Sequence, residues 1–166
     1  MSDTTTDEFL QHATEVRDRI NEHLEVFGTF GDGCPDRLQQ AIRHSLMAPG
    51  KRLRPLMVLT AAETCGYNRE IAIPAACAIE MVHTYSLIHD DLPAMDDDDM
   101  RRGQPTVHRR WDEATAVRAG DALQTLAFEV VSDPRSDLSG EVRAALSLSL
   151  AQASGAAGMV LGQALD

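Results

Sequence analysis

Apolar residues recur along the chain at steps of three and four, which is the spacing of one face of an α-helix. The first such run comprises Phe9, Ala13, Val16, Ile20, Leu24 and Phe27. It predicts a helix over residues 6–27, and Thr5 and Glu8 have the spacing of a capping box at its start. No segment alternates with a period of two over a useful length, and no internal repeat is visible. The pattern therefore predicts an all-α protein.

Glycine and proline interrupt this pattern and divide the rest of the chain into further helices. We expect a second helix that carries Leu38, Ile42 and Leu46 and ends before Pro49, a third over residues 53–65, a fourth from near Ile71 to Ile88, a fifth over residues 111–131 and a sixth from Glu141 onward. The fourth is apolar on most of its surface, so we expect it to be buried nearly all round. The sixth continues through a stretch rich in Ala, Ser and Gly to the last residue, and we expect neighbouring helices to hold it.

The fourth predicted helix leads directly into a dense group of carboxylates. Six aspartates fall within residues 90–99, and charges this close repel one another unless cations lie between them. Pro93 disfavours helix at the residue before it. We therefore expect Asp90 and Asp91 to close the helix, and Asp96 to return after an irregular turn and face them.

Metal binding is one interpretation of this acidic segment. Magnesium takes one or two carboxylates together with substrate phosphate oxygens, which makes Asp90, Asp91 and Asp96 candidate ligands. An EF-hand calcium loop does not fit, because Met95 or Arg101 stands where that loop requires glycine at its sixth position. A solvated acidic loop remains the alternative.

A basic motif, Gly50-Lys51-Arg52-Leu53-Arg54-Pro55, stands at the start of the third predicted helix and contains the one lysine among 15 basic residues. Lys51 and Arg54 are three residues apart and can project from one helix face, and the unpaired N–H groups of a helix start favour an anion. The motif suits a diphosphate, with a solvated basic helix start as the alternative. Beside the acidic segment, it indicates two phosphorylated substrates, one held by cations directly and one through bridging metal.

Two histidines precede the acidic segment. His83 lies seven residues before Asp90, about two helical turns away on the same face. By spacing alone, a histidine satisfied within the core is the more common outcome. His89, next to the aspartates, either supports the candidate ligands or adds local polarity.

Composition narrows the classes of function. The formal net charge of −11 argues against nucleic-acid binding, because phosphate backbones are held by clustered Lys and Arg. The three cysteines are widely spaced and include no C-x-x-C pair, so neither a disulfide framework nor a zinc site is indicated. The first residues lack the features of a signal peptide, and no apolar run approaches the roughly 18 residues of a membrane span. We expect a cytoplasmic protein without membrane insertion.

Four segments together resemble the trans-isoprenyl diphosphate synthases, the polyprenyl synthetase family, and within it the bacterial-type farnesyl diphosphate synthases. They are G-K-R-L-R-P at 50–55, H-T-Y-S-L-I-H-D-D-L-P-A-M-D-D-D-D-M-R-R-G at 83–103, A-G-D-A-L-Q-T-L-A-F at 119–128 and G-Q-A-L-D at 162–166. The resemblance thus covers residues 50–166. The combination is specific, whereas any one segment alone is not.

The resemblance implies roles for the acidic segment and for the two arginines that follow it. Asp90, Asp91 and Asp96 match the family's first aspartate-rich motif, which binds Mg²⁺ that bridges to the allylic diphosphate. Arg101 matches the direct contact to that diphosphate. Arg102 matches the neighbouring arginine that turns toward isopentenyl diphosphate.

The resemblance also implies contacts outside the acidic segment. Lys51, Arg54 and His83 match the remaining contacts to isopentenyl diphosphate. Tyr85 and the two-residue Pro93-Ala94 insertion resemble the farnesyl-type pattern, in which an aromatic residue before the motif stops chain growth at the farnesyl length.

The family's fold and activity follow as expectations. They are the isoprenoid-synthase helical bundle, a homodimer, and a Mg²⁺-dependent prenyltransferase that condenses isopentenyl diphosphate with dimethylallyl or geranyl diphosphate to give farnesyl diphosphate. The family's second aspartate-rich motif, its Lys-Thr pair and a further basic segment are not in this sequence. We therefore expect residues 1–166 to be the amino-terminal portion, with about six helices, of a single polyprenyl synthetase domain, and to be inactive alone.

Two other functions stay open from the sequence. A non-catalytic subunit of a heteromeric prenyl synthase accounts for the missing motifs. An all-α metal phosphohydrolase with an H…HD…D set is indicated by His44, His89-Asp90 and Asp121 or Asp166. That second alternative leaves the basic motif and the arginine pair unexplained.

Overall fold

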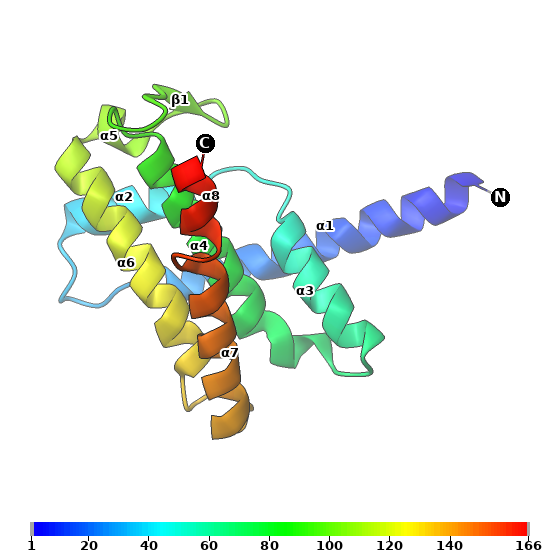
Figure 1. Ribbon diagram of the computed structural model, residues 1–166. Helices are drawn as coiled ribbons and strands as arrows, with labels where there is room; N and C mark the ends of the chain where they lie inside the picture. The colour runs from blue at the N-terminus through cyan, green and yellow to red at the C-terminus, as the bar shows by residue number, and fades with distance from the viewer. Residues whose placement is uncertain (1, 166) are drawn as a thin grey trace.

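The computed structural model describes residues 2–165, with side chains from residue 6 onward, and is helical along most of that length (Figure 1). Its helices are α1 (Ser2–Phe27), α2 (Asp36–Leu46), α3 (Leu53–Thr64), α4 (Ile73–Asp90), α5 (Val107–Arg110), α6 (Glu113–Ser132), α7 (Gly140–Ser154) and α8 (Met159–Leu165), with a 3₁₀ turn, η1 (Arg69–Ala72), before α4. One hairpin joins β1 (Met100–Arg101) to β2 (Gln104–Pro105) in antiparallel register. The expected all-α class is confirmed.

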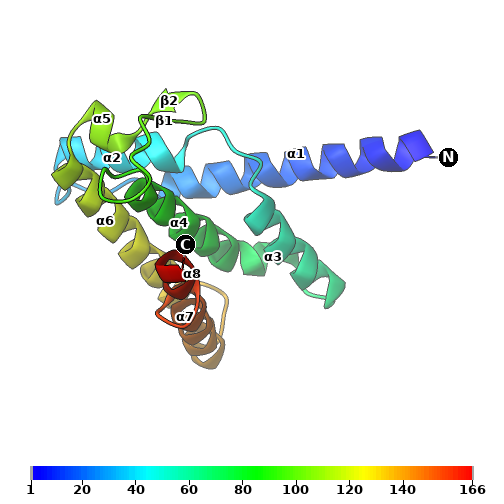
Figure 2. The same ribbon diagram turned by 45° about the horizontal axis from the view of Figure 1, so that its top comes forward.

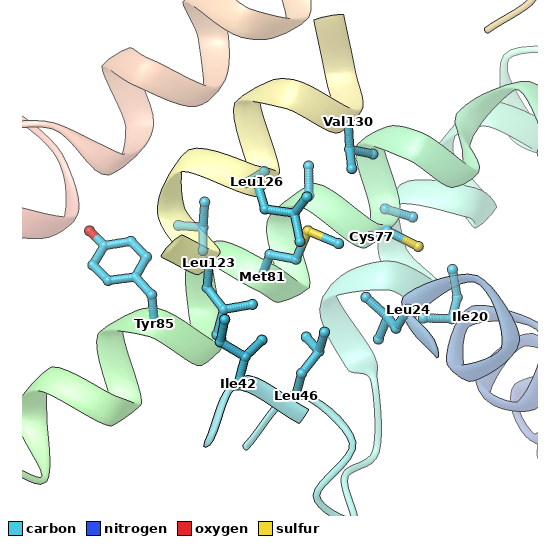
Figure 3. Packing of buried hydrophobic residues seen from close by; sticks show 14 of the residues in the cluster. Ile20, Leu24, Ile42, Leu46, Cys77, Met81, Tyr85, Leu123, Leu126 and Val130 are labelled. Carbon is cyan, nitrogen blue, oxygen red and sulfur yellow. The ribbon is translucent and has the colours of Figure 1, made fainter. Parts of the chain in front are cut away.

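Helix α4 lies at the centre of the fold and contacts α1, α2, α3, α6 and α7. Its mean hydropathy is high and its apolar residues face several directions, so it is buried on most of its surface, as expected. Side chains from α1, α2, α4 and α6 meet in one core (Figure 3). The labelled members of this core are Ile20, Leu24, Ile42, Leu46, Cys77, Met81, Tyr85, Leu123, Leu126 and Val130.

Helix α1 begins at Ser2, four residues earlier than expected. Thr5 therefore lies inside the helix and does not cap it, so the predicted capping box is wrong at this position; the side chain of Thr5 lies outside the described ones. The apolar stripe is buried only in the second half of the helix, whereas Phe9 and Leu10 are exposed. In Figures 1 and 2 the first half of α1 extends away from the other helices.

The second to fifth expected helices are confirmed to within a few residues. Helix α4 is preceded by the 3₁₀ turn η1, begins at Ile73 and carries Pro74 in its first turn, where a missing N–H costs nothing. Helix α6 begins at Glu113 because the side chain of Asp112 accepts a hydrogen bond from the N–H of Thr115 and so forms the N-cap.

The prediction of one continuous sixth helix is wrong, because residues 155–158 interrupt it and separate α7 from α8. Gly155 follows the last residue of α7, and a Cβ there would lie 2.7 Å from the carbonyl oxygen of Ala151. A Cβ on Gly158 would lie 2.1 Å from the carbonyl oxygen of Ala153. Only glycine allows the backbone to fold back this closely, so the two glycines end one helix and permit the next to start.

Two helical stretches are long and apolar enough to cross a membrane by length and composition, which corrects the expectation that no such run exists. The first, Arg69–Asp90, includes the central helix, and 61% of its apolar window is buried inside the fold. The second, Gly140–Leu165, is only 11% buried and is interrupted at Gly155. Packing in the core accounts for the apolar character of the first stretch.

Truncation of the core contact between α4 and α6 is expected to reduce stability strongly. Leu123 on α6 is 0% exposed, so Leu123→Ala should lower the free energy of unfolding by about 2–5 kcal/mol in chemical denaturation. Leu148 on α7 is 59% exposed, and Leu148→Ala, the matched control, should change it by about 0.5 kcal/mol or less. Equal losses in the two variants would contradict this description of the core.

Candidate functional site

The acidic loop, residues 90–99, folds back onto the end of α4. The backbone N–H of Asp96 donates to the carbonyl oxygen of Asp90 at 2.8 Å. The N–H of Asp98 donates to the carbonyl oxygen of Asp91 at 3.2 Å. The loop thus returns as expected, and Pro93, which lacks an N–H, lies in the turn that breaks the helix.

Asp90 and Asp96 form a pair of mutually repelling carboxylates. Asp96 is exposed, whereas Asp90 is half-buried. Burial and, secondarily, the charge of Asp96 raise the pKa of Asp90 above its ordinary value. On α8, the side-chain amide of Gln163 donates to Asp90 Oδ1. The pair therefore has oxygen ligands and uncompensated negative charge in one place.

Asp91 is arranged differently from Asp90. Its side chain is 5% exposed, and Arg101 Nε donates to its Oδ1 at 2.5 Å. Burial raises the pKa of Asp91, while the bond to Arg101 opposes this shift. Arg101 also donates to Asp98 Oδ2 at 3.0 Å. Of the three predicted metal ligands, Asp91 is therefore the one turned toward an arginine.

The hairpin carries Arg102 away from the acidic loop. Arg102 has a left-handed backbone conformation with φ 53°, and Gly103, with φ 78°, completes the tight turn. The guanidinium lies against Gly50, where a Cβ would approach its Nη1 to 2.7 Å. Burial, and then the nearby charge of Arg52, lower the pKa of Arg102. Glycine at position 50 thus makes room for the second arginine of the pair.

A cavity of about 340 Å³, here called the cationic pocket, brings together four of the residues selected from the sequence. Lys51, Arg54, His83 and Arg102 line it, together with Pro49, Gly50, Arg52, Leu53 and Glu80. The expectation that Lys51 and Arg54 share a helix face is wrong, because α3 begins at Leu53 and the left-handed Arg52 (φ 49°) precedes it. The two cations still reach the same pocket.

His83 lies on α4 at the wall of the cationic pocket. Burial, and then the charge of Arg54, lower the pKa of His83, so the imidazole favours its neutral form. A neutral imidazole offers one donor and one acceptor, which suits hydrogen bonding rather than charge pairing.

A second cavity of about 440 Å³, here called the apolar groove, runs between α4 and the α7–α8 region. Arg54 and His83 line one part of it and Asp90 another, while most of its remaining wall is apolar. The apolar members are Ile79, Val82, Leu87, Leu150, Ala153 and Met159. The groove therefore joins the cationic pocket to the carboxylate pair along one helix.

Tyr85 lines neither of these two cavities. Its side chain is buried and packs edge-on against His89, with ring centroids 5.7 Å apart. Burial and the charge of Asp90 raise the pKa of its phenol. His89 in turn contacts the carbonyl oxygen of Val117 at 3.1 Å. A Cβ on Gly120 would lie 2.2 Å from His89 Nε2, so the glycine in A-G-D leaves room for this ring.

The residues of the predicted phosphohydrolase set are not assembled. The His44 ring contacts the carbonyl oxygen of Pro105 and Arg110 Nη1 on the hairpin side, whereas His89 lies 4.0 Å from Asp121. Asp166 lies outside the described residues. Within residues 2–165, the one group of three ligand atoms close enough for a metal consists of Asp97, Asp99 and His108.

Sequence reasoning missed several residues around the site. His108, which the sequence pattern did not single out, is buried beside Asp97 and Asp99, and Asp99 already pairs with Arg109. Arg52 and Glu80 form a buried ion pair at the cationic pocket. Glu80 could have indicated this ion pair from the sequence. It is a carboxylate within a largely apolar helix, and buried acids are almost always paired.

Comparison with known proteins identifies the family. The Polyprenyl synthetase family model matches residues 35–166. The chain is 55% identical over 130 residues to the farnesyl diphosphate synthase of Micrococcus luteus, covering 78% of this chain and 44% of that protein. It is 46% identical over 162 residues to that of Bacillus subtilis, covering 97% and 54%. The solved apo FPP/GFPP synthase of Zymomonas mobilis superposes with a TM-score of 0.90 at 43% identity, covering 96% of this chain and 57% of that one.

The solved structures that this chain resembles show that its all-α bundle has the isoprenyl-synthase type of helical fold. The chain belongs to the polyprenyl synthetase family. It spans about half the length of the curated relatives that it matches.

Metal binding at the acidic loop is expected to depend on pH. Because the pKa of folded Asp90 is raised, the folded state holds more protons than the unfolded state between the two pKa values, and stability falls as pH rises through that window. A divalent cation binds the charged form, so Mg²⁺ should raise the Tm at neutral pH. This shift should shrink as pH falls through the raised pKa. At roughly 100 times Kd the stabilisation should be about 2.7 kcal/mol.

Two variants separate this effect from nonspecific ion binding. Asp90→Asn should raise the Tm in metal-free buffer at neutral pH and remove the Mg²⁺-dependent shift. Asp137→Asn, at an exposed position in the α6–α7 connection, should leave the shift unchanged. A shift that survives in Asp90→Asn, or that does not vary with pH, would disprove metal binding at this carboxylate.

Proposed function

We propose that the protein is a Mg²⁺-dependent prenyltransferase that condenses isopentenyl diphosphate with dimethylallyl or geranyl diphosphate to give farnesyl diphosphate. The observation that carries the proposal is the pairing of a cationic pocket with a pair of carboxylates along one helix. The cationic pocket lies at His83, the carboxylate pair lies at Asp90, and the apolar groove extends between them. The farnesyl diphosphate synthases among the relatives support the same activity.

The acidic loop fits a hard divalent cation. Asp90 and Asp96 offer carboxylate oxygens, and burial, followed by the charge of Asp96, raises the pKa of Asp90, so a bound cation would favour its charged form. We propose that these two residues hold Mg²⁺, and that Asp91, bonded to Arg101, joins them or holds that arginine in place. Mg²⁺ bound there would neutralise part of the charge on the departing diphosphate.

The chain's own residues then bind and orient the two substrates. In the reaction, the carbon–oxygen bond of the allylic diphosphate breaks and its electron pair leaves with diphosphate, whose negative charge Arg101 faces. The double bond of isopentenyl diphosphate attacks the allylic cation, and a proton is then lost. Lys51, Arg54 and Arg102 hold the diphosphate of the second substrate. The apolar wall of the groove limits capture of the cation by water.

The remaining properties belong to the same proposal. We expect isopentenyl and allylic diphosphates to be the partners of the site, and the protein to act as a cytoplasmic homodimer. Gel filtration with light scattering tests the dimer, and assay of separated cell fractions tests the location.

Removal of either carboxylate of the proposed metal pair should impair chemistry rather than folding. In the full-length protein, Asp90→Asn and Asp96→Asn should each lower turnover by orders of magnitude and leave the helical circular dichroism intact. Steady-state assay of farnesyl diphosphate formation from geranyl and isopentenyl diphosphates measures the effect. Near-normal turnover in both variants would rule out the assignment.

Tyr85 is proposed to limit product length. It lies five residues before Asp90, about 7.5 Å along the helix, and burial, followed by the charge of Asp90, raises the pKa of its phenol. Tyr85→Ala should therefore lengthen the prenyl product, as measured by chromatography of the dephosphorylated alcohols. An unchanged product distribution would show that the limit to chain growth lies elsewhere.

A further inference from the structure

A single buried guanidinium connects three helical elements beside the cationic pocket. Arg52 Nη1 donates to Glu80 Oε1 on α4 at 2.7 Å, and Arg52 Nε donates to Asn21 Oδ1 on α1 at 2.9 Å. Its Nη2 donates to the carbonyl oxygens of Leu46, at 2.8 Å, and Ala48, at 3.3 Å. These two carbonyls belong to the end of α2 and the segment after it. The loop that leads into α3 is thus fixed to α1, α2 and α4 through one side chain.

The ion pair within this network is almost completely buried. The side chains of Arg52 and Glu80 are 2% and 3% exposed. A buried pair gains little stability over well-packed apolar residues, because desolvating two charges offsets their attraction. A buried guanidinium that donates to several acceptors does fix geometry, since each hydrogen bond has a preferred direction. The network therefore has a clearer role in placing the backbone than in stabilising the fold.

Residues close in sequence to Arg52 and to Glu80 line the cationic pocket. Lys51 and Arg54 flank Arg52 in the sequence, and His83 follows Glu80 by about one helical turn on α4. Arg102 lies against Gly50, which belongs to the same loop. A shift of residues 50–54 would therefore move the proposed diphosphate contacts together.

The charge around the pocket is divided unevenly. Throughout residues 2–165, the side chains of Lys51, Arg54 and Arg102 have no hydrogen-bond or ion-pair partner, and all three line the pocket. Arg52 is the one cation there that Glu80 neutralises. The pocket thus presents three unpaired cations held around one compensated pair, and this charge suits a diphosphate.

We propose that Arg52 and Glu80 are positioning residues for isopentenyl diphosphate, which set the spacing of Lys51, Arg54 and Arg102 without contacting the substrate. This inference rests on the proposed function. A positioning role differs from a purely structural role in its effect on the two substrates, because it should affect binding of only one of them. Asp90 lines the apolar groove, and neither Asp90 nor Asp96 lines the cationic pocket, so binding of the allylic diphosphate should not depend on Arg52.

Two conservative variants test the pair in the full-length protein. Arg52→Lys keeps the charge but cannot donate to Asn21, Glu80 and both carbonyls at once, and Glu80→Gln keeps the size but removes the compensating charge. Each should raise the KM for isopentenyl diphosphate roughly tenfold or more and change the KM for geranyl diphosphate by about twofold or less. Glu80→Asp, which retains the carboxylate, should show a smaller rise than Glu80→Gln.

Two controls separate positioning from general weakening. Glu70→Gln removes the Arg19–Glu70 ion pair, in which both side chains are 46% exposed and which lies outside the pocket lining, and should leave both KM values unchanged. Ile42→Val removes a buried methyl group from the core and should lower the Tm without changing the ratio of the two KM values. These controls match the loss of an ion pair and the loss of stability separately.

Each outcome decides the matter. If Arg52→Lys and Glu80→Gln do not fold, Asn21→Ala, which removes one of the bonds to Arg52, serves instead and should raise the KM for isopentenyl diphosphate alone. An unchanged ratio of KM values in folded variants, or a parallel rise in both, overturns the inference and leaves the proposed function intact. A wild-type protein that does not condense the two diphosphates overturns the proposed function and this inference with it.

Discussion

The burial of α4 on most of its surface is the constraint on which the rest of the structure depends. A charged or polar group can enter such a helix only where a partner or solvent meets it. Glu80 meets Arg52, and His83 lies at the cationic pocket. Asp90 occurs where the helix ends and solvent begins. Val82 and Leu87, which lie along the same helix, are apolar and contribute to one wall of the groove. One buried helix thereby sets both the separation of the charged ends and the apolar character of the surface between them.

The two charged ends of the site have opposite signs but share one arrangement of paired and unpaired charges. At the cationic pocket, the buried arginine is neutralised by Glu80 while the exposed cations remain unpaired. At the acidic loop, the buried Asp91 is paired with Arg101, while Asp90 and Asp96 have no ion-pair partner among the described residues, and burial and then the charge of Asp96 raise the pKa of Asp90. In both places, a buried charge has an ion-pair partner, Arg52 in the pocket and Asp91 in the loop, and the uncompensated charge faces the cavity or solvent. Such uncompensated charge lowers stability without ligand, as is usual for sites arranged for binding rather than for folding.

Local patterns account for what the sequence predicted and for what it missed. Helix positions follow from apolar spacing and from breaks at Pro and Gly, which act within a few residues, and Pro93 alone was enough to place the return of the acidic loop. The hairpin was missed because each strand has two residues, too few to show alternation. The break at Gly155 was missed because an isolated glycine is often tolerated inside a helical pattern. Arg52 and Glu80 are 28 residues apart, so no local spacing relates them, and only the fold brings them together.

The adjacent arginines show how the fold connects the two ends of the site. Arg101 occupies a short strand and bonds to Asp91 and Asp98, whereas Arg102 turns toward Gly50. Successive side chains of an extended backbone point to opposite sides, and the left-handed conformation of Arg102 increases this divergence. Two neighbouring residues are therefore directed to two different places, Arg101 to the acidic loop and Arg102 to the cationic pocket. Gly50 leaves room for the Arg102 guanidinium, whereas Asp91 and Asp98 hold Arg101, so the side chains of the two arginines are anchored separately.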